Sequence, residues 1–155
     1  MNYHKYYPTD VVNGKGTRAS LFVSGCEHKC RGCFSKSTWS ASSGKPFTKS
    51  LEDRIIQDLQ DKRIKRKGLS LLGGDPLHPK NCQSILRLIN RVRLESPDSD
   101  IWLWTGYTIG NLSPIQEQIA LKVDVIIDGP FVEDLADPSL KWRGSSNQIM
   151  HVNNQ

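Results

Sequence analysis

The chain has 155 residues, of which 37% are hydrophobic and 24% are charged, and its formal net charge is +5. This length fits one domain, residues 1–155, with enough core to fold without disulfide staples. The first residues are polar and aromatic, and no apolar run approaches the roughly 20 residues that span a bilayer, so we expect a cytoplasmic protein with no membrane contact.

Apolar runs and turn signals alternate along the first half of the chain. A strand is predicted over residues 18–23. A helix is then predicted from Ser50 to a point before Gly68, and residues 69–72 are predicted to form a short strand. This order of strand, helix and strand indicates a parallel sheet built from βα units.

The second half continues the pattern. A helix is predicted over residues 81–95 and a strand over residues 101–105. Ser113 to Gln116 combines a capping residue, a proline at the first helical position and a glutamine three residues after the cap, which predicts a third helix ending near Ala120. Residues 123–127 form a β-branched run typical of a buried parallel strand, and residues 147–152 are the candidate for a last strand.

The fold class follows from this order and from the length. A complete eightfold barrel needs about 250 residues, so this chain can supply only part of one. We therefore expect an α/β fold, an incomplete and open βα barrel with mostly parallel strands and helices outside. Its open side would let a large partner reach the centre.

Three cysteines follow the first predicted strand with the spacing C-x3-C-x2-C, at Cys26, Cys30 and Cys33. Three thiolates in one loop can ligate three irons of a cubane cluster, whose full protein ligation takes four cysteines. One iron is then open, as in a catalytic metal site. The alternative is a structural zinc site with His28 or His78 as the fourth ligand, and the spacing alone favours the cluster.

Two other features carry weaker signals. Cys82 lies far from the other cysteines and is interpreted as a free thiol. The basic run Lys62–Lys67 is interpreted as a solvated helix end, with a docking or nucleic-acid surface as the alternative. No aromatic residue interleaves this run, so we expect no direct nucleic-acid partner.

A glycine-rich loop, Gly73-Gly74-Asp75-Pro76, follows the second predicted strand. By itself it is an ordinary turn. In register with the cysteine loop, it resembles the radical S-adenosylmethionine superfamily, which implies the open-barrel fold of that type. The resemblance also implies that the methionyl amine and carboxylate chelate the open iron, and that backbone carbonyls of the glycine loop, where glycine permits a close approach, bind the amine.

Further segments resemble the activating proteins of anaerobic (class III) ribonucleoside-triphosphate reductase, and the resemblance covers nearly the whole chain. They are Asn13–Arg18, Leu21–Cys26, Ser37–Trp39, Leu77–Pro79, Trp104–Tyr107 and Trp142–Gln148. The chain departs from that pattern at Phe34 and Ser35, where the family usually has tyrosine and asparagine, and at Lys15, where it more often has proline.

The resemblance implies one 4Fe-4S cluster per chain, held by Cys26, Cys30 and Cys33, with S-adenosyl-L-methionine as the second cofactor. Gly32, Cys33, Phe34 and Gly74 would line the adenosylmethionine, and Gly73, Asp75 and Pro76 would shape the loop. No acid or base is assigned. Trp104 and Tyr107 are interpreted as core or rim aromatics, His78 as a loop residue satisfied by backbone groups, and Asp128, Trp142, Arg143 and Asn147 receive no role.

The implied reaction is reductive cleavage of S-adenosylmethionine, after which the 5′-deoxyadenosyl radical takes a hydrogen atom from a glycine of the reductase. The implied partners are the large subunit of that reductase and an external one-electron donor such as a flavodoxin-like protein, which the basic surface would suit if the donor is acidic. Two alternatives stay open: the activase of another glycyl-radical enzyme, such as pyruvate formate-lyase, and a zinc-bound interaction module.

Overall fold

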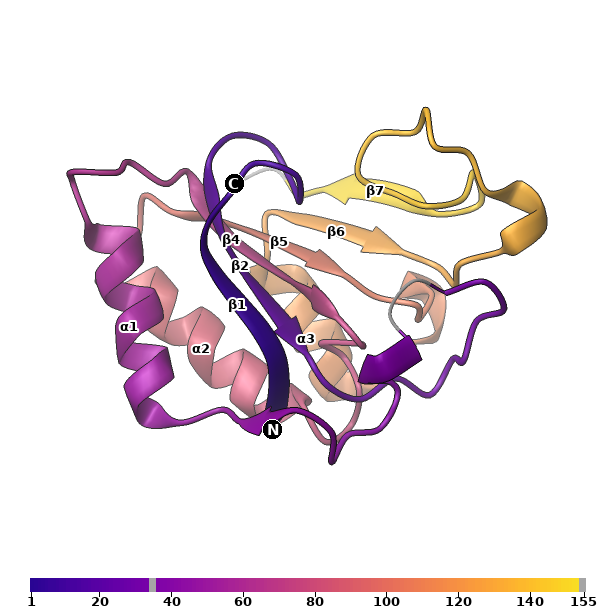
Figure 1. Ribbon diagram of the computed structural model, residues 1–155, viewed down its shortest axis with the longest axis horizontal. Coiled ribbons are helices and arrows are strands. Elements are labelled where there is room, and N and C mark those ends of the chain that lie inside the picture. Colours follow the sequence, from indigo (N-terminus) through magenta and orange to yellow (C-terminus); the bar gives the residue numbers. More distant parts are fainter. Residues whose placement is uncertain (34–35, 154–155) are drawn as a thin grey trace.

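The computed structural model describes residues 1–33 and 36–153, and within this part seven strands form one sheet in the order β3-β1-β2-β4-β5-β6-β7 (Figure 1). The strands are β1 (Asn2–Asp10), β2 (Arg18–Val23), β3 (Lys45–Pro46), β4 (Gly68–Gly73), β5 (Asp100–Trp104), β6 (Val125–Asp128) and β7 (Ile149–Val152). The helices are α1 (Lys49–Gln60), α2 (Cys82–Glu95) and α3 (Pro114–Lys122), with 3-10 turns η1 (Lys36–Thr38), η2 (Ile109–Asn111) and η3 (Glu133–Leu135).

The centre of the sheet is parallel and its edges are antiparallel. β2, β4, β5 and β6 pair in parallel, whereas β1 runs antiparallel to β2, and β7 antiparallel to β6. The mixed α/β class and the parallel βα units are thus confirmed for the centre. The strand order has two edges, and the incomplete barrel expected from the chain length stays a prediction.

The helices pack on one face of the sheet. Alternate residues of the central strands, such as Leu21, Leu71 and Leu103, are fully buried against apolar residues of all three helices. Only every second residue of a strand faces the helices, because successive side chains of a strand point to opposite faces of the sheet. Each such leucine contributes about 1.5–3 kcal/mol when it leaves water.

The opposite face carries the other alternate residues and has no helical cover among the described residues. Trp102, Val125 and Ile127 form a second apolar cluster there, joined by Trp104 and Trp142. Arg18, at the start of β2, is fully buried on this face, and its guanidinium pairs with Asp100 at 2.6 Å across the register of β2, β4 and β5. A buried cation without such a partner would be costly.

One predicted helix cap is confirmed, and a second helix has a cap that was not predicted. Ser113 and Gln116 form the expected capping box at the start of α3. α1 begins one residue earlier than predicted, where the Thr48 hydroxyl caps it. In the described part of the chain, no helix is both long and apolar enough to cross a membrane.

The basic run Lys62–Lys67 is not the helix end that was predicted. α1 stops at Gln60, and the run belongs to the connection between α1 and β4. Arg66 is buried and donates to the backbone carbonyls of Pro8 and Asp58. These bonds hold the connection against β1, which a continued helix would prevent.

Candidate functional site

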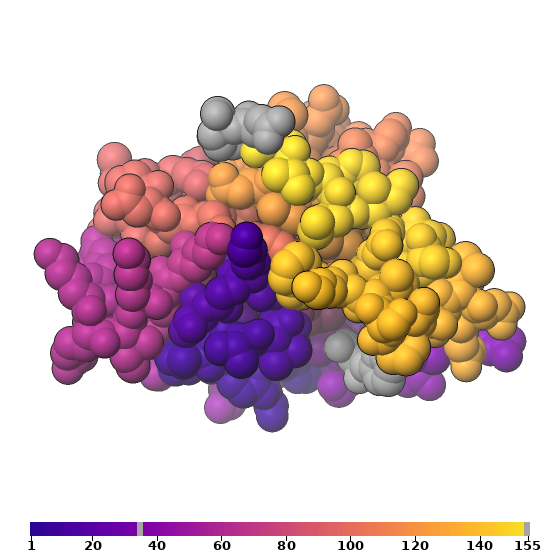
Figure 2. Space-filling view, turned by 90° about the horizontal axis from the view of Figure 1, so that it is seen from above, coloured from indigo at the N-terminus to yellow at the C-terminus, as the bar shows by residue number. Residues whose placement is uncertain are grey.

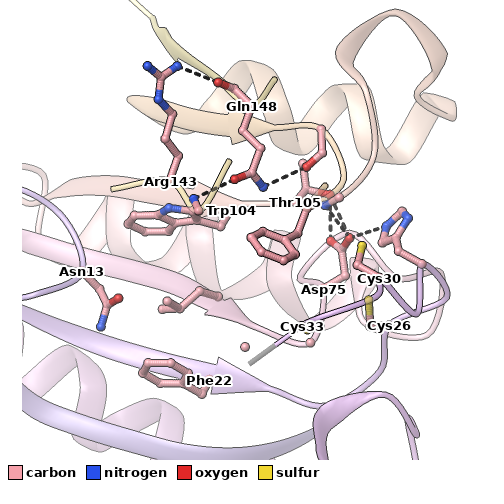
Figure 3. Close-up of a pocket in the computed structure, with 18 of the residues that line it drawn as sticks. Asn13, Phe22, Cys26, Cys30, Cys33, Asp75, Trp104, Thr105, Arg143 and Gln148 are labelled. Atoms are coloured by element: carbon pink, nitrogen blue, oxygen red, sulfur yellow. Dashed lines mark hydrogen bonds and ion pairs between the residues drawn. The ribbon is translucent and has the colours of Figure 1, made fainter. Parts of the chain in front are cut away.

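A cavity of about 360 Å³ lies on the face of the sheet opposite the helices, where the parallel strands end. That volume falls in the range of small-molecule pockets, and the carboxyl ends of parallel strands are where open α/β sheets bind ligands. Figure 3 shows Cys26, Cys30 and Asp75 at one end of the cavity and Asn13 and Arg143 at the other. Its lining residues from the sheet include Phe22, Leu72 and Trp104.

The cysteine loop begins directly after β2. Gly25 N donates to Thr38 O at 2.6 Å, and Cys26 N donates to Trp39 O at 3.0 Å, so both ends of the loop region are tied together. All three cysteines of the loop line the cavity and are half-buried. Burial raises the pKa of the Cys26 thiol, and the nearby Asp75 carboxylate raises it further. A thiolate at Cys26 therefore needs a compensating positive charge, which a bound iron-sulfur cluster would supply.

The donor set fits an iron-sulfur cluster. Among the described residues, no group of three His, Cys, Asp or Glu side chains is gathered to hold a single metal ion. In a cubane, each thiolate binds a different iron, so the three thiols need not converge on one point. The two histidines of the zinc alternative are engaged elsewhere: His28 Nε2 lies 2.7 Å from Asp75, and His78 Nδ1 accepts from Lys80 N.

The two glycines at the end of β4, Gly73 and Gly74, pack against the start of the cysteine loop. A Cβ on Gly73 would lie 2.6 Å from Val23 N, and Gly73 has a φ of +107°. Gly74 N donates to Val23 O at 2.7 Å, and Asp75 N donates to Gly25 O at 2.6 Å. The contact that requires glycine here is thus between two backbone segments of the protein, and it sets the glycine loop and the cysteine loop in register.

Asp75 is a fully buried carboxylate that joins three loops. It accepts from Thr105 Oγ1 at 2.8 Å, from Gly106 N at 2.9 Å and from Leu77 N at 2.9 Å. His28 of the cysteine loop is its fourth neighbour. A buried carboxylate is costly unless it is hydrogen-bonded, and these bonds satisfy it.

The segment between β6 and β7, residues 129–148, forms one wall of the cavity, and we call it the C-terminal wall. Phe131, Trp142, Arg143 and Gln148 line the cavity from this side. Trp142 has a φ of +63°, and its carbonyl accepts from Trp104 Nε1 at 2.5 Å. In Figure 2 the orange and yellow C-terminal residues and the indigo N-terminal residues form adjoining parts of the surface.

An exposed ion pair links the C-terminal wall to the cysteine loop. Arg31 Nε lies 2.9 Å from Glu133 Oε2, although the Arg31 side chain is 90% exposed. Gly32 has a φ of +77°, and a Cβ there would lie 3.0 Å from Glu133 Cδ. Glycine is therefore the residue that lets the loop turn beside the wall.

The structure brings together most of the residues predicted for the site. Gly73, Gly74 and Asp75 line the cavity with the three cysteines, whereas Gly32 and Pro76 lie outside the described lining. Phe34 lies outside the described residues. Trp104 lines the cavity rather than filling the core, and Tyr107 packs against the core.

Residues of the site that were not predicted from the sequence include Thr105, Phe131 and, as a partner of Asp75, His28. Thr105 follows β5 directly, so its place at the carboxyl end of a parallel strand was a usable signal. Nothing in the sequence around Phe131 indicates that its segment turns back over the cavity.

Neither Cys82 nor the basic run lines the cavity. Cys82 is buried, and its thiol donates to Leu77 O, as expected for a free thiol packed at the start of α2. Lys62, Lys65 and Lys67 line a second hollow, beside the start of β4, with Glu95 and Asp98. The six residues of β4 lie between this second hollow and the three cysteines. At 3.3 Å per residue, the separation is about 20 Å.

Comparisons with known proteins show which family the chain belongs to. A family model described as a 4Fe-4S single cluster domain matches residues 12–151. The chain is 61% identical over 151 residues to the anaerobic ribonucleoside-triphosphate reductase-activating protein of Escherichia coli strain K12, covering 97% of this chain and 98% of that protein. Proteins of the same name are 59% identical in Vibrio cholerae, over 97% of each chain, and 45% identical in Enterobacteria phage T4, over 99% of this chain and 95% of the phage protein.

Proposed function

Because the chain belongs to the family of anaerobic ribonucleoside-triphosphate reductase-activating proteins and carries its 4Fe-4S domain, we propose that it generates a glycyl radical on that reductase. It would do so as a radical S-adenosylmethionine enzyme acting in the cytoplasm, as a single domain over residues 1–155 with an open βα barrel. The single observation that carries the proposal is the cavity that brings three cysteines and the Gly73-Gly74 loop together at the ends of the parallel strands.

We assign two roles to the residues of the cavity, which are binding of the cluster and binding of S-adenosyl-L-methionine. Cys26, Cys30 and Cys33 would hold three irons and leave the fourth open to the cavity. Cys33, Gly73, Gly74 and Asp75 line the space beside it and would bind S-adenosyl-L-methionine, together with Gly32, Phe34 and Pro76 of the two loops. When bound, the reduced cluster would supply one electron that cleaves the sulfonium to methionine and a 5′-deoxyadenosyl radical, which takes a hydrogen atom from a glycine of the reductase.

The protein itself positions these groups and keeps water away from them. Asp75 joins the carboxyl ends of β4 and β5 by hydrogen bonds. The separation between the glycine loop and the cysteines is therefore held constant. The C-terminal wall covers the far side of the cavity with Phe131 and Trp142. Apolar cover of this kind protects a radical from solvent.

Two experiments test the proposal. The anaerobically reconstituted protein, given dithionite and S-adenosylmethionine, is expected to form 5′-deoxyadenosine and methionine in equal amounts. Adding the cognate reductase is expected to produce a glycyl radical signal in electron paramagnetic resonance. Absence of deoxyadenosine would overturn the cleavage chemistry, and deoxyadenosine without a glycyl signal would overturn the assignment of the protein substrate. The electron donor in the cell is proposed to be a separate one-electron carrier such as a flavodoxin-like protein.

A further inference from the structure

His28 lies between the first two cysteines and reaches from the cysteine loop into the fold. Its Nε2 is 2.7 Å from Asp75 Oδ2, and its side chain is 17% exposed. The ring packs edge-on against Tyr107, with centroids 4.4 Å apart. It also covers Gly106, where a Cβ would lie 2.5 Å from His28 Cδ2. The imidazole is therefore held on three sides.

The acceptor of His28 is fixed independently of His28. Asp75 already accepts from Thr105 Oγ1 and from two backbone N–H groups, at Gly106 and Leu77. A carboxylate that accepts from several donors is held in one orientation, and an Nε2–H of His28 is within hydrogen-bond distance of it. His28 thus binds an anchor that residues outside the cysteine loop also hold in place.

The other side-chain pairs of the loop involve exposed groups and are therefore weak: Arg31 pairs with Glu133, and Glu27 lies 3.7 Å from His78. Backbone bonds fix Gly25 and Cys26 at its start, and Cys33 N donates back to Cys30 O. Lys29, next to His28, has a φ of +48°, which costs energy for a residue with a side chain. A strained turn persists when surrounding contacts over-determine it, and the His28 contact is adjacent to this one.

We propose that His28 is a positioning residue, which docks the cysteine loop onto Asp75 so that Cys26 and Cys30 present their thiolates to the cluster in one fixed geometry. The inference rests on the proposed function only in taking the loop to hold an iron-sulfur cluster. In this role His28 is not an iron ligand. It acts through the two cysteines that flank it.

The test compares His28→Ala, His28→Gln and a matched control, His151→Ala. His151 Nε2 lies 2.9 Å from the buried Asp128, so it forms a histidine-carboxylate pair of the same kind outside the cavity lining. Glutamine keeps an N–H donor that can reach Asp75. Each protein is reconstituted anaerobically with iron and sulfide and examined for cluster content, for the electron paramagnetic resonance spectrum of the reduced cluster, and for its midpoint potential.

We expect His28→Ala to retain about 10-fold less cluster under chelator challenge, a typical effect of removing a group that orients ligands, and to give a broadened resonance with a shifted potential. His28→Gln should restore a single narrow spectrum, and His151→Ala should match the unchanged protein. A wild-type spectrum and potential in His28→Ala would overturn the proposal. So would a failure of His28→Gln to improve on alanine in a protein whose circular dichroism shows it folded.

These readouts require neither the reductase nor S-adenosylmethionine. Failure of the proposed function would appear instead as a wild-type protein with a normal cluster spectrum and no deoxyadenosine. The two failures are therefore distinguishable.

Discussion

A Cβ on Gly74 would lie 2.7 Å from the carbonyl oxygen of Gly25, so the second glycine of one loop and the residue before the first cysteine of the other are in backbone contact. No real Cβ atom tolerates that separation. The two loops of the site therefore cannot be altered independently.

We predict that Gly74→Ala displaces the cysteine loop and lowers deoxyadenosine formation by about 100-fold, since misplacement by about 1 Å can cost that much. The control is Gly110→Ala, because a Cβ at Gly110 meets nothing within 4 Å. The rates are measured with dithionite as reductant. Equal rates in the two variants would contradict the role of the contact.

If Cys26, Cys30 and Cys33 hold the cluster, their replacement should affect S-adenosylmethionine cleavage, and replacement of Cys82 should not. Cys26→Ala, Cys30→Ala and Cys33→Ala should each abolish S-adenosylmethionine cleavage, whereas Cys82→Ala should spare it. Cys82 is packed under the site and faces Leu77 O, not the cavity. The measurement is deoxyadenosine formed per reconstituted chain, and full activity in any of the first three variants would refute the ligand set.

The thiol of Cys82 should make stability depend on pH. Burial raises its pKa to about 11, with a further contribution from Asp75, while an unfolded cysteine titrates near ~8.5. A raised pKa favours the folded state below the unfolded value, and this stabilisation is lost as the pH rises through about 11.

Urea unfolding of the iron-free protein and of Cys82→Ala at several pH values between about 8 and 11 tests this expectation. The difference in unfolding free energy should shrink as the pH rises, because the variant lacks the titrating thiol. The groups that the two proteins share cancel in the comparison. A difference that stays constant over this range would contradict the raised pKa.

Removing the buried cation at the start of β2 should destabilise the whole sheet. Arg18→Ala leaves Asp100 without its partner and removes the bond to Ser70 Oγ, at an expected cost of about 3 kcal/mol. That corresponds to a fall of roughly 10 °C in the melting temperature. Arg63→Ala, which breaks an exposed pair with Asp61, should leave the melting temperature unchanged.

We expect the basic run Lys62–Lys67 not to be the docking site of an electron donor that reduces a cluster held by the three cysteines. The run lies about 20 Å from the cysteines, at the other end of β4. The rate of electron transfer falls steeply with distance. We predict that the double variant with Lys62→Glu and Lys65→Glu keeps its rate with a protein donor as well as with dithionite. A several-fold loss confined to the protein donor would place docking at this run.

Local signals predicted the parts of the site that follow strands directly. The strand that ends at Val23 leads into the cysteines, and the strand that ends at Gly73 leads into the glycine loop, so a parallel pairing was enough to bring them together. The capping box at Ser113 was equally readable, because its two partners lie within one helical turn.

The parts that escaped prediction depend on distant pairings. β1 is a half-buried strand with polar residues and Pro8, and only its antiparallel pairing with β2 makes it regular. Asp75 was predicted only to shape its loop, because its bonds to Thr105 and His28 involve segments that are distant in the sequence. Trp142 is placed by contact with Trp102, 4.8 Å away between ring centroids, from the far end of the chain.

The C-terminal wall also has a consequence for biosynthesis. Domains are made from the N-terminus, so the cysteines and the glycine loop leave the ribosome well before residues 129–148. A nascent chain that ends before residue 129 already carries every proposed ligand, yet its cavity still lacks one side. A cluster inserted before residues 129–148 have folded would pass through a wider opening than one inserted into the finished protein.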